Sequence, residues 1–445
     1  MRRTKQKEKT QGVTAKDDIW LLFRGIKSLL RCDDAEVVQE LARYIMSQHS
    51  SLQVSNAFIE RKKGTIIPNF IAFLSGVTRF LEVHSGRRKD NIVWVARYDN
   101  ERRAIEKLQP LIPELSWTEL EFRRPPSISA IFALLRLIVP NWRRFFRLTR
   151  LLHQRHKFFK VFRVVELISY FIRYRDIFEN SDFRLAVVSN HSNPHGIAFN
   201  LAARRCGIPV VLITHGMPVR PVAKLSFDLA VVHCQIAHRI YLEAGCKLGE
   251  TIAHGRRQNY LAMPDSPLPK LLNIGIFLCK DVNEERLQAL VNNLVVHPRV
   301  SNILIRPHPK NLWLGFDQWI QSLNSSCVQK SSHDMVSGDL EMLDMVFGGN
   351  SSVLVEAVTA GRPSVYISGL DCGSTDLHEF VAHGLVYQMN GEMNFDPDAI
   401  LRFYLKPEWT NVLRLFSNID EDEVSVNAQI EYAVRRITGL TNYSE

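Results

Sequence analysis

The sequence predicts an α/β protein with two Rossmann-type domains and a helical N-terminal extension. Residues 185–216 and 343–368 each read as a buried strand, a loop, a helix and a second buried strand, in the same order. Strands that alternate with helices in this way form parallel sheets. A proline-rich stretch, MPDSPLPKLL at 263–272, separates the two units and is typical of a linker. We therefore expect a helical extension at 1–85, Rossmann-type domains at 86–265 and 271–405, and C-terminal helices at 406–445.

The first part of the chain is expected to be helical up to about residue 84. AEVVQELARYIMS at 35–47 has apolar residues at helical spacing and follows two aspartates that could cap a helix. NIVWVARY at 91–98 then reads as the first buried strand, and ERRAIEKLQPL after it as a helix. Later strands are expected at LAVVSN, IPVVLITHG and FDLAVVHC, and the last strand and exit loop of this domain at TIAHGRRQNYL (251–261). HSNPHG is expected to be a loop, and the helix IAFNLAARRC after it should end at Gly207.

The second domain repeats this order of elements. NIGIFL at 273–278 is expected to open its sheet, and LDMVFGG at 343–349 to be a further strand. NSS forms the next loop, SVLVEAVTA a helix that Gly361 ends, and RPSVYISG another strand.

Charge points to an anionic partner. The chain has 445 residues with 56 Lys and Arg against 46 Asp and Glu, a formal net charge of +10. Such a balance favours phosphate esters, anionic lipid headgroups or nucleic acid. The usual nucleic-acid-binding motifs are absent from the sequence, so we expect no nucleic-acid partner.

One block, 123–175, is unusually basic and apolar at once. It carries thirteen Lys and Arg residues and one acid, Glu166, interleaved with Phe, Leu, Ile and Trp. Basic amphipathic helices of this type lie in a bilayer interface, although long domain helices with solvated arginines remain the alternative. The uncharged stretch at 64–78 is too short to span a membrane. The seven cysteines show no CxxC pair, which is typical of reduced thiols. We expect a cytoplasmic protein held peripherally on the inner face of the cell membrane.

The stretch SNILIRPHPKN at 301–311 ends a buried strand on two prolines. Proline fixes φ and removes a donor, so the segment is expected to be a stiff loop at the carboxyl end of a strand. Arg306, His308 and Lys310 would lie together there, and such a set favours an anion such as phosphate. A surface turn with incidental charges is the alternative interpretation.

GGNSSVLVEA at 348–357 follows a predicted strand and opens a predicted helix. The glycines, including Gly349, would let the backbone approach a ligand, with Asn350, Ser351 and Ser352 beside the free N–H groups of the first helical turn. Glu356, one turn further on, could take ribose hydroxyls or be an ordinary solvated glutamate. A simple serine N-cap is the alternative interpretation of this segment.

Histidines follow two strands of the first domain. His215, in ITHGMP, could be a general base or a phosphate contact. His191 and His195, in VVSNHSNPHG, are further candidates for activating an acceptor. Each could also be a histidine that is merely satisfied at a strand end or in a turn. Arg256 lies in the exit loop near the predicted hinge.

Four short motifs occur in series: HGMP at 215–218, GRRQN at 255–259, RPHP at 306–309 and GGNSS at 348–352. The series resembles the teichoic-acid glycerophosphotransferases, whose landmarks are HGTP, GxPRND, RxHP and a Ser-Ser loop. The His-Pro and Ser-Ser pair is also similar to bacterial sialyltransferases, polysialyltransferases and the Kdo transferases of capsule assembly. Met217 stands where the first family has threonine, and Gly349-Asn350 where it has an acid.

The resemblance implies a GT-B-type fold, with two Rossmann-type domains facing across a cleft, and a cytidine-activated donor. It implies that Arg306 and His308 bind the nucleotide phosphate, that Ser351 and Ser352 hold it, and that His215 is a base or phosphate contact. We expect an inverting glycosyltransferase without a metal or other cofactor, acting on a lipid-linked polysaccharide acceptor of capsule or lipopolysaccharide synthesis. Other polysaccharide-assembly proteins are possible partners. A glycerophosphotransferase with a CDP-polyol, a nucleotide-sugar 2-epimerase and a non-catalytic membrane-bound scaffold remain the alternatives.

Overall fold

The computed structural model describes most of the chain from residue 91 onward. The described residues are 91–120, 167, 170–190, 192–220, 222–254, 261–263, 267–280, 282–309, 313, 315–323, 325–371, 376–389 and 395–440. The expected N-terminal helices, most of the basic block, and His191, Arg256 and Lys310 lie outside these residues. Among the described helices, none is long and apolar enough to cross a bilayer.

The first sheet has six parallel strands in the order β2-β1-β3-β4-β5-β6. The strands are β1 (Ile92–Val95), β2 (Trp117–Glu119), β3 (Leu185–Val188), β4 (Val210–Ile213), β5 (Ser226–Val232) and β6 (Lys247–Ala253). The helical elements between them include α5 (Asp99–Glu106), η2 (Gln109–Leu111), α7 (Pro194–Arg205) and α8 (Gln235–Glu243), and residues 170–179 are also helical. Strand order reverses between β1 and β3, so the crevice where such sheets bind ligands lies at the carboxyl ends of these two strands.

The second sheet is also six-stranded and parallel, in the order β12-β11-β10-β7-β8-β9. Its strands are β7 (Leu272–Phe277), β8 (Val300–Arg306), β9 (Val328–Lys330), β10 (Met345–Gly348), β11 (Ser364–Ile367) and β12 (Tyr387–Met389). The helices are α9 (Glu284–Val295), α10 (Phe316–Ser322), α11 (Val336–Glu341), α12 (Val353–Thr359), α13 (Pro397–Tyr404) and α14 (Trp409–Phe416). Here the order reverses between β7 and β10. Two Rossmann-type sheets confirm the predicted fold class.

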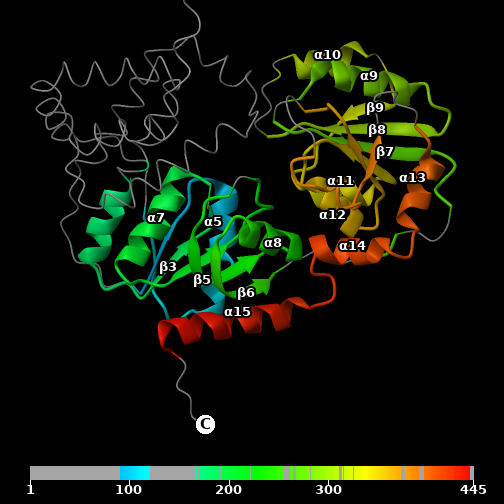
Figure 1. The fold of residues 1–445 in the computed structure, drawn as a ribbon. Coiled ribbons are helices and arrows are strands. Elements are labelled where there is room, and N and C mark those ends of the chain that lie inside the picture. Colours follow the sequence, from blue (N-terminus) through cyan, green and yellow to red (C-terminus); the bar gives the residue numbers. More distant parts are fainter. Residues whose placement is uncertain are drawn as a thin grey trace, which may run out of the picture.

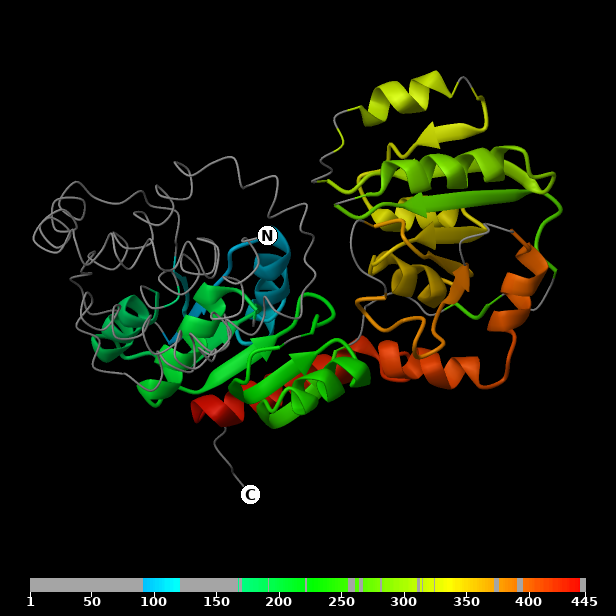
Figure 2. The same cartoon turned by 45° about the horizontal axis from the view of Figure 1, so that its top comes forward.

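The chain returns to the first sheet at its end. Helix α15 (Glu423–Thr438) runs along that sheet, away from α14, as Figures 1 and 2 show. Its apolar face packs with the core residues of β1, β3, β4 and β5, and Val426, Ile430 and Val434 are buried there. Arg436 pairs with Glu250 on β6, and Asn418 donates to the Ala253 carbonyl at 2.7 Å. The C-terminal segment therefore belongs structurally to the first sheet.

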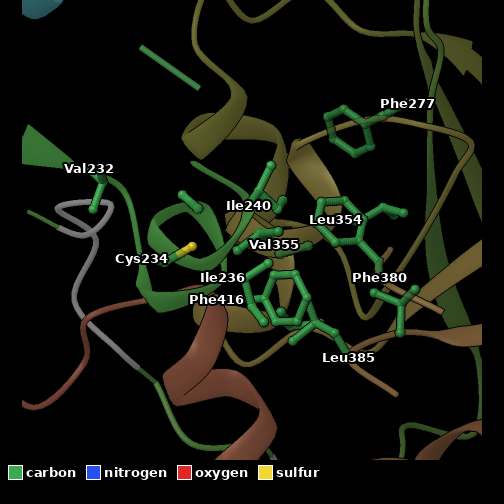
Figure 3. Packing of buried hydrophobic residues seen from close by; sticks show 14 of the residues in the cluster. Val232, Cys234, Ile236, Ile240, Phe277, Leu354, Val355, Phe380, Leu385 and Phe416 are labelled. Atoms are coloured by element: carbon green, nitrogen blue, oxygen red, sulfur yellow. The ribbon is translucent and has the colours of Figure 1, made fainter. Parts of the chain in front are cut away.

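Apolar side chains join the two sheets into one buried cluster. Figure 3 shows Ile236 and Ile240 of α8 beside Leu354 of α12 and Phe416 of α14. The chain just before the linker is also held against the second domain, because the Leu261 N–H donates to the carbonyl of Thr359 on α12 at 2.9 Å. The two sheets are thus fixed relative to each other by burial of apolar surface on α8.

Three strands, β2, β9 and β12, were not predicted from the sequence. Each has only three residues and lies at or near a sheet edge, so its apolar pattern is too short to separate it from a loop. Helix α7 also begins earlier than expected. It starts at Pro194, which suits the first helical position because its missing N–H would be unpaired there.

A buried tyrosine ties α13 to the edge of the second sheet. The hydroxyl of Tyr404 accepts hydrogen bonds from the N–H of Ser364 at 3.1 Å and of Tyr387 at 3.2 Å, and donates to the Ser364 carbonyl. Burial raises the pKa of Tyr404 well above its usual value, so the hydroxyl stays neutral and can donate.

We predict that Tyr404→Phe lowers the free energy of unfolding by about 1–3 kcal/mol, because buried backbone groups lose their partner. Denaturant unfolding would measure the change. The control is Tyr432→Phe on α15, whose side chain is 50% exposed and whose substitution should change stability little. Equal stability of the Tyr404→Phe variant and the parent would contradict this prediction.

Candidate functional site

The carboxyl edge of the first sheet is organised by Asn190, two residues after β3. Its Nδ2 donates to Glu101 Oε1 at 2.5 Å, and its Oδ1 accepts from the N–H groups of Ser192 at 2.9 Å and Asn193 at 2.8 Å. An asparagine that bonds the backbone two and three residues ahead closes a tight turn. The segment expected to be a loop therefore begins with a turn closed by Asn190, and Asn190 lies at the switch point of its sheet.

His215, two residues after β4, is held against the end of β3. Its Nδ1 lies 3.1 Å from the Ser189 carbonyl oxygen and 3.1 Å from the Ser189 hydroxyl. A carbonyl oxygen can only accept, so the bond to the Ser189 carbonyl requires a hydrogen on Nδ1, whereas the Ser189 hydroxyl could also donate to a bare Nδ1. With the hydrogen on Nδ1, the lone pair of the neutral ring is on Nε2, which is the arrangement a general base needs. The side chain is partly exposed.

His195 does not suit the role predicted for it. Its side chain is 2% exposed, in the first turn of α7, with the ring edge-on to Tyr170 and Nε2 3.9 Å from Glu101 Oε2. A side chain buried in this way cannot meet an acceptor hydroxyl, so the prediction for His195 is corrected. The cause is the early start of α7, which carries this histidine into the core.

The GGNSS loop of the second sheet contacts the loop that follows β11. The Asn350 N–H donates to the Asp371 carboxylate, and Asn350 Oδ1 accepts from the Leu377 N–H at 2.6 Å. A Cβ added at Gly349 would lie 2.1 Å from Asp371 Oδ2, so glycine is required for this approach. The close approach that we predicted for a ligand at Gly349 is made here by the carboxylate of Asp371.

The two serines follow directly. Ser351 Oγ accepts from the Val353 N–H at 3.3 Å, whereas the Ser352 side chain does not cap α12. Both side chains are partly exposed, as is Glu356 one turn further on. Ser352 therefore occupies the N-cap position of α12 without a side-chain bond to the helix, and the serine bond to the helix start is made by Ser351. Ser351 and Ser352, together with Gly349 and Asn350, form the loop between β10 and α12, beside the switch point of the second sheet.

Arg306, the last residue of β8, donates hydrogen bonds to other residues of the second domain. Its Nη1 donates to Asp339 Oδ2 at 2.6 Å and to the His333 carbonyl at 2.8 Å, and its Nη2 donates to the Asp334 carbonyl at 2.8 Å. Asp339 is 0% exposed. The fork of Arg306 thus holds the segment between β9 and α11, and its expected contact with a phosphate stays a prediction.

His308 follows β8 by two residues and is partly exposed between Pro307 and the exposed Pro309. It lies at the carboxyl edge of the second sheet, the same edge as the GGNSS loop, because the strands are parallel. Within the described residues, no group of three or more His, Cys, Asp or Glu side chains is arranged to hold a metal ion.

An ionic contact joins the two edges. Arg220, five residues after His215, bonds Glu379 Oε1 of the second domain through Nε at 3.0 Å and also pairs with Glu243 of α8. Glu379 has a positive φ of 59° and follows Leu377, which bonds Asn350. The segment after His215 therefore touches the loop that supports Asn350.

Sequence reasoning missed Glu101, Asp371 and Arg220. Glu101 had a usable signal, an acid in the first helical turn after a predicted strand. Asp371 also follows a predicted strand, but nothing local shows that its carboxylate reaches Gly349. Arg220 contacts a residue 159 positions away, and no local pattern predicts such a pair.

Comparison with known proteins finds no matching family model and no matching curated protein. Among solved structures, the chain is similar to an S. aureus MnaA–UDP co-structure, with 11% identity, a TM-score of 0.47, and coverage of 80% of this chain and 99% of that one. The calicheamicin glycosyltransferase CalG4 shows 12% identity, a TM-score of 0.46 and coverage of 80% and 100%. The wall teichoic acid polymerase TagF with CDPG shows 11% identity, a TM-score of 0.42, and coverage of 87% of this chain and 99% of that one. At these values the similarity does not bear on donor, acceptor or residue roles.

We predict that Arg306→Lys lowers the free energy of unfolding by about 1.5–3 kcal/mol, because an ammonium cannot reproduce the separate bonds of the fork to buried Asp339 and the two carbonyls. The control is Arg299→Lys, whose partner Asp398 is exposed and whose pair should contribute little. Denaturant unfolding of both variants is the measurement. A loss no larger than that of the control would show that the contacts of Arg306 contribute little to stability.

Proposed function

We propose that this protein is an enzyme that transfers a group from a nucleotide-activated donor, and specifically an inverting glycosyltransferase with a CMP- or CDP-linked sugar donor. The observation that carries the proposal is the junction of the two carboxyl edges. Arg220, on the segment after His215, bonds Glu379, and the same loop bonds Asn350 beside Ser351. A candidate base from one domain and a candidate phosphate loop from the other thus belong to one region.

In the proposed reaction, Nε2 of His215 accepts the proton of an acceptor hydroxyl. The oxygen attacks the activated carbon of the donor while the bond from that carbon to the phosphate oxygen breaks, which inverts the configuration. The electron pair leaves with the nucleotide, whose phosphate gains negative charge. Hydrogen-bond donors fixed in advance where charge develops stabilise such a transition state.

The leaving phosphate is proposed to be met by His308, Lys310 and the hydroxyls of Ser351 and Ser352. Arg306 contributes indirectly, because it anchors the segment after β9 and so stiffens the end of β8. Glu356 is proposed to take ribose hydroxyls, and Arg256 to contact the donor near the hinge. His191 is kept as a second candidate for the base.

A lipid-linked saccharide is the proposed acceptor, and capsule or lipopolysaccharide assembly the proposed setting. The support is the basic block at 123–175, with its thirteen cations among aromatic and aliphatic residues. Such a surface would hold the enzyme at the inner face of the membrane, where a lipid-linked acceptor and partner assembly proteins are found.

Glu101 bears on the choice between transfer and epimerisation. A 2-epimerase needs carboxylates that exchange a proton with the sugar. Glu101 is the carboxylate that bonds the Asn190 loop, and it is 0% exposed. A side chain buried in this way cannot exchange a proton with a ligand, which favours transfer. Product analysis with donor alone separates the two, because an epimerase needs no acceptor.

We predict that His215→Gln and His308→Ala each lower kcat by about 10- to 100-fold or more. The first change removes the base, and the second removes a hydrogen bond to a charged phosphate. The measurement is donor consumption in a screen of CMP-, CDP- and UDP-activated donors with a lipid-linked acceptor, on variants whose melting temperatures match the parent.

The control is His297→Ala. His297 precedes Pro298 at the opposite end of β8, so it shares the His-Pro dipeptide but not the carboxyl edge. Its loss should leave kcat nearly unchanged. If the His308→Ala variant keeps the activity of the parent, the RPHP segment acts only as a rigid turn and not as a phosphate contact. If the released product is CMP and the acceptor gains a polyol phosphate, the enzyme is a glycerophosphotransferase.

We predict that the full chain binds anionic liposomes and that changing Arg143, Arg144 and Arg147 to glutamate weakens this binding, as does added salt. Sedimentation with vesicles of phosphatidylcholine and phosphatidylserine measures it. A matched triple change on exposed C-terminal cations, Arg402→Glu, Lys406→Glu and Arg414→Glu, should have a smaller effect. Equal effects of both triple changes would contradict a specific role for the basic block.

A further inference from the structure

Glu101 is a fully buried carboxylate whose two oxygens both accept hydrogen bonds. Oε1 accepts from Asn190 Nδ2 at 2.5 Å, and Oε2 accepts from the Arg97 N–H at 2.7 Å. Both neighbours are donors, so two acceptor oxygens are required at this position. A neutral amide has one oxygen and would place an NH₂ group against one of these donors.

The contact connects the first strand to the peptide that holds His215. Asn190 follows Ser189, and the carbonyl and hydroxyl of Ser189 both lie 3.1 Å from His215 Nδ1. When Glu101 fixes the Asn190 side chain, it fixes the orientation of the adjoining peptide. The path from Glu101 to the imidazole therefore consists of one side-chain bond, one peptide unit and one bond to Nδ1.

The backbone of Asn190 itself is closely packed. A Cβ added at Gly196 would lie 1.9 Å from the Asn190 carbonyl oxygen, so the start of α7 lies directly against the residue that follows Ser189. Asn190 Oδ1 is also occupied by the N–H groups of Ser192 and Asn193. The side chain of Asn190 thus has a single orientation, with Nδ2 toward Glu101.

We propose that Glu101 is a positioning residue for His215: through Asn190 and the Ser189 carbonyl it keeps the hydrogen of the imidazole on Nδ1 and its lone pair on Nε2. The kinetic consequence rests on the proposed function, in which His215 is the base. The effect on the tautomer does not, because it concerns the protein without any substrate.

The test is a four-member set: the parent, Glu101→Gln, Asn190→Asp, and the two changes combined. Glu101→Gln places an NH₂ group against the Asn190 Nδ2 or the Arg97 N–H, which are both donors. Asn190→Asp places a carboxylate against the carboxylate of Glu101. In the combined variant the roles are exchanged. The amide of residue 101 donates to the carboxylate of residue 190 and still accepts from the Arg97 N–H, while that carboxylate still accepts from Ser192 and Asn193. Non-additivity between the changes measures the coupling.

The first readout is the ¹⁵N spectrum of the His215 ring, assigned by comparison with His215→Gln. We expect an Nδ1–H tautomer in the parent and in the combined variant, and a shifted tautomer mixture in each single variant. The second readout is turnover. Each single variant should lower kcat roughly tenfold, with the KM for donor unchanged, and the combined variant should recover most of the loss.

The control is Glu119→Gln, the same chemical change on β2, where the carboxylate pairs with Arg102. It should leave the His215 spectrum unchanged. The proposal is overturned if Glu101→Gln leaves the His215 tautomer as in the parent, or if the combined variant fails to restore it. If the spectra behave as expected while His215→Gln keeps full activity, the positioning role stands and the proposed base is wrong.

Discussion

The packing of α8 against the helices of the second sheet is the constraint on which the candidate site depends. Ile236 and Ile240 lie beside Leu354 and Phe416, and together they bury apolar surface between the two sheets. This non-directional contact sets the distance between the sheets, and the Arg220–Glu379 bond then sets which loops meet. Without this packing, the carboxyl edges would remain two separate groups of polar side chains.

Both sheets use the same device at their switch points, an asparagine just after the central strand whose side chain shapes the local loop. The Asn190 side chain bonds Glu101 and the backbone of its own turn. The Asn350 side chain accepts from the Leu377 N–H, and the Asn350 backbone N–H donates to Asp371. The partner carboxylate comes from helix α5 in the first case and from the segment after β11 in the second. Glycine allows the close approach, at Gly196 in the first sheet and at Gly349 in the second. The two loops are thereby fixed before any ligand arrives.

Charged side chains at the site divide into those that support structure and those available for chemistry. Arg306 and Asp339 bond each other in the second domain, and Glu101 is fully buried in the first. Burial makes such groups effective at orienting neighbours, because a buried polar group that loses its partner costs the fold free energy. The partly exposed side chains, His215 and those of Ser351 and Ser352, remain at the surface of these supported loops.

The sequence by itself determined the two-sheet architecture, because long buried strands and helices leave strong periodic patterns in runs such as LAVV and MVFG. It also located the loops that follow β3, β4, β8 and β10, since proline, glycine and histidine interrupt those patterns. Only the tertiary structure decided the roles within these loops. In the structure His195 is buried in the core, and Arg306 donates to Asp339. Glu101 bonds Asn190, which lies 89 positions away in the sequence. Such pairings depend on which strands become neighbours, and that is set by packing of the whole chain rather than by local pattern.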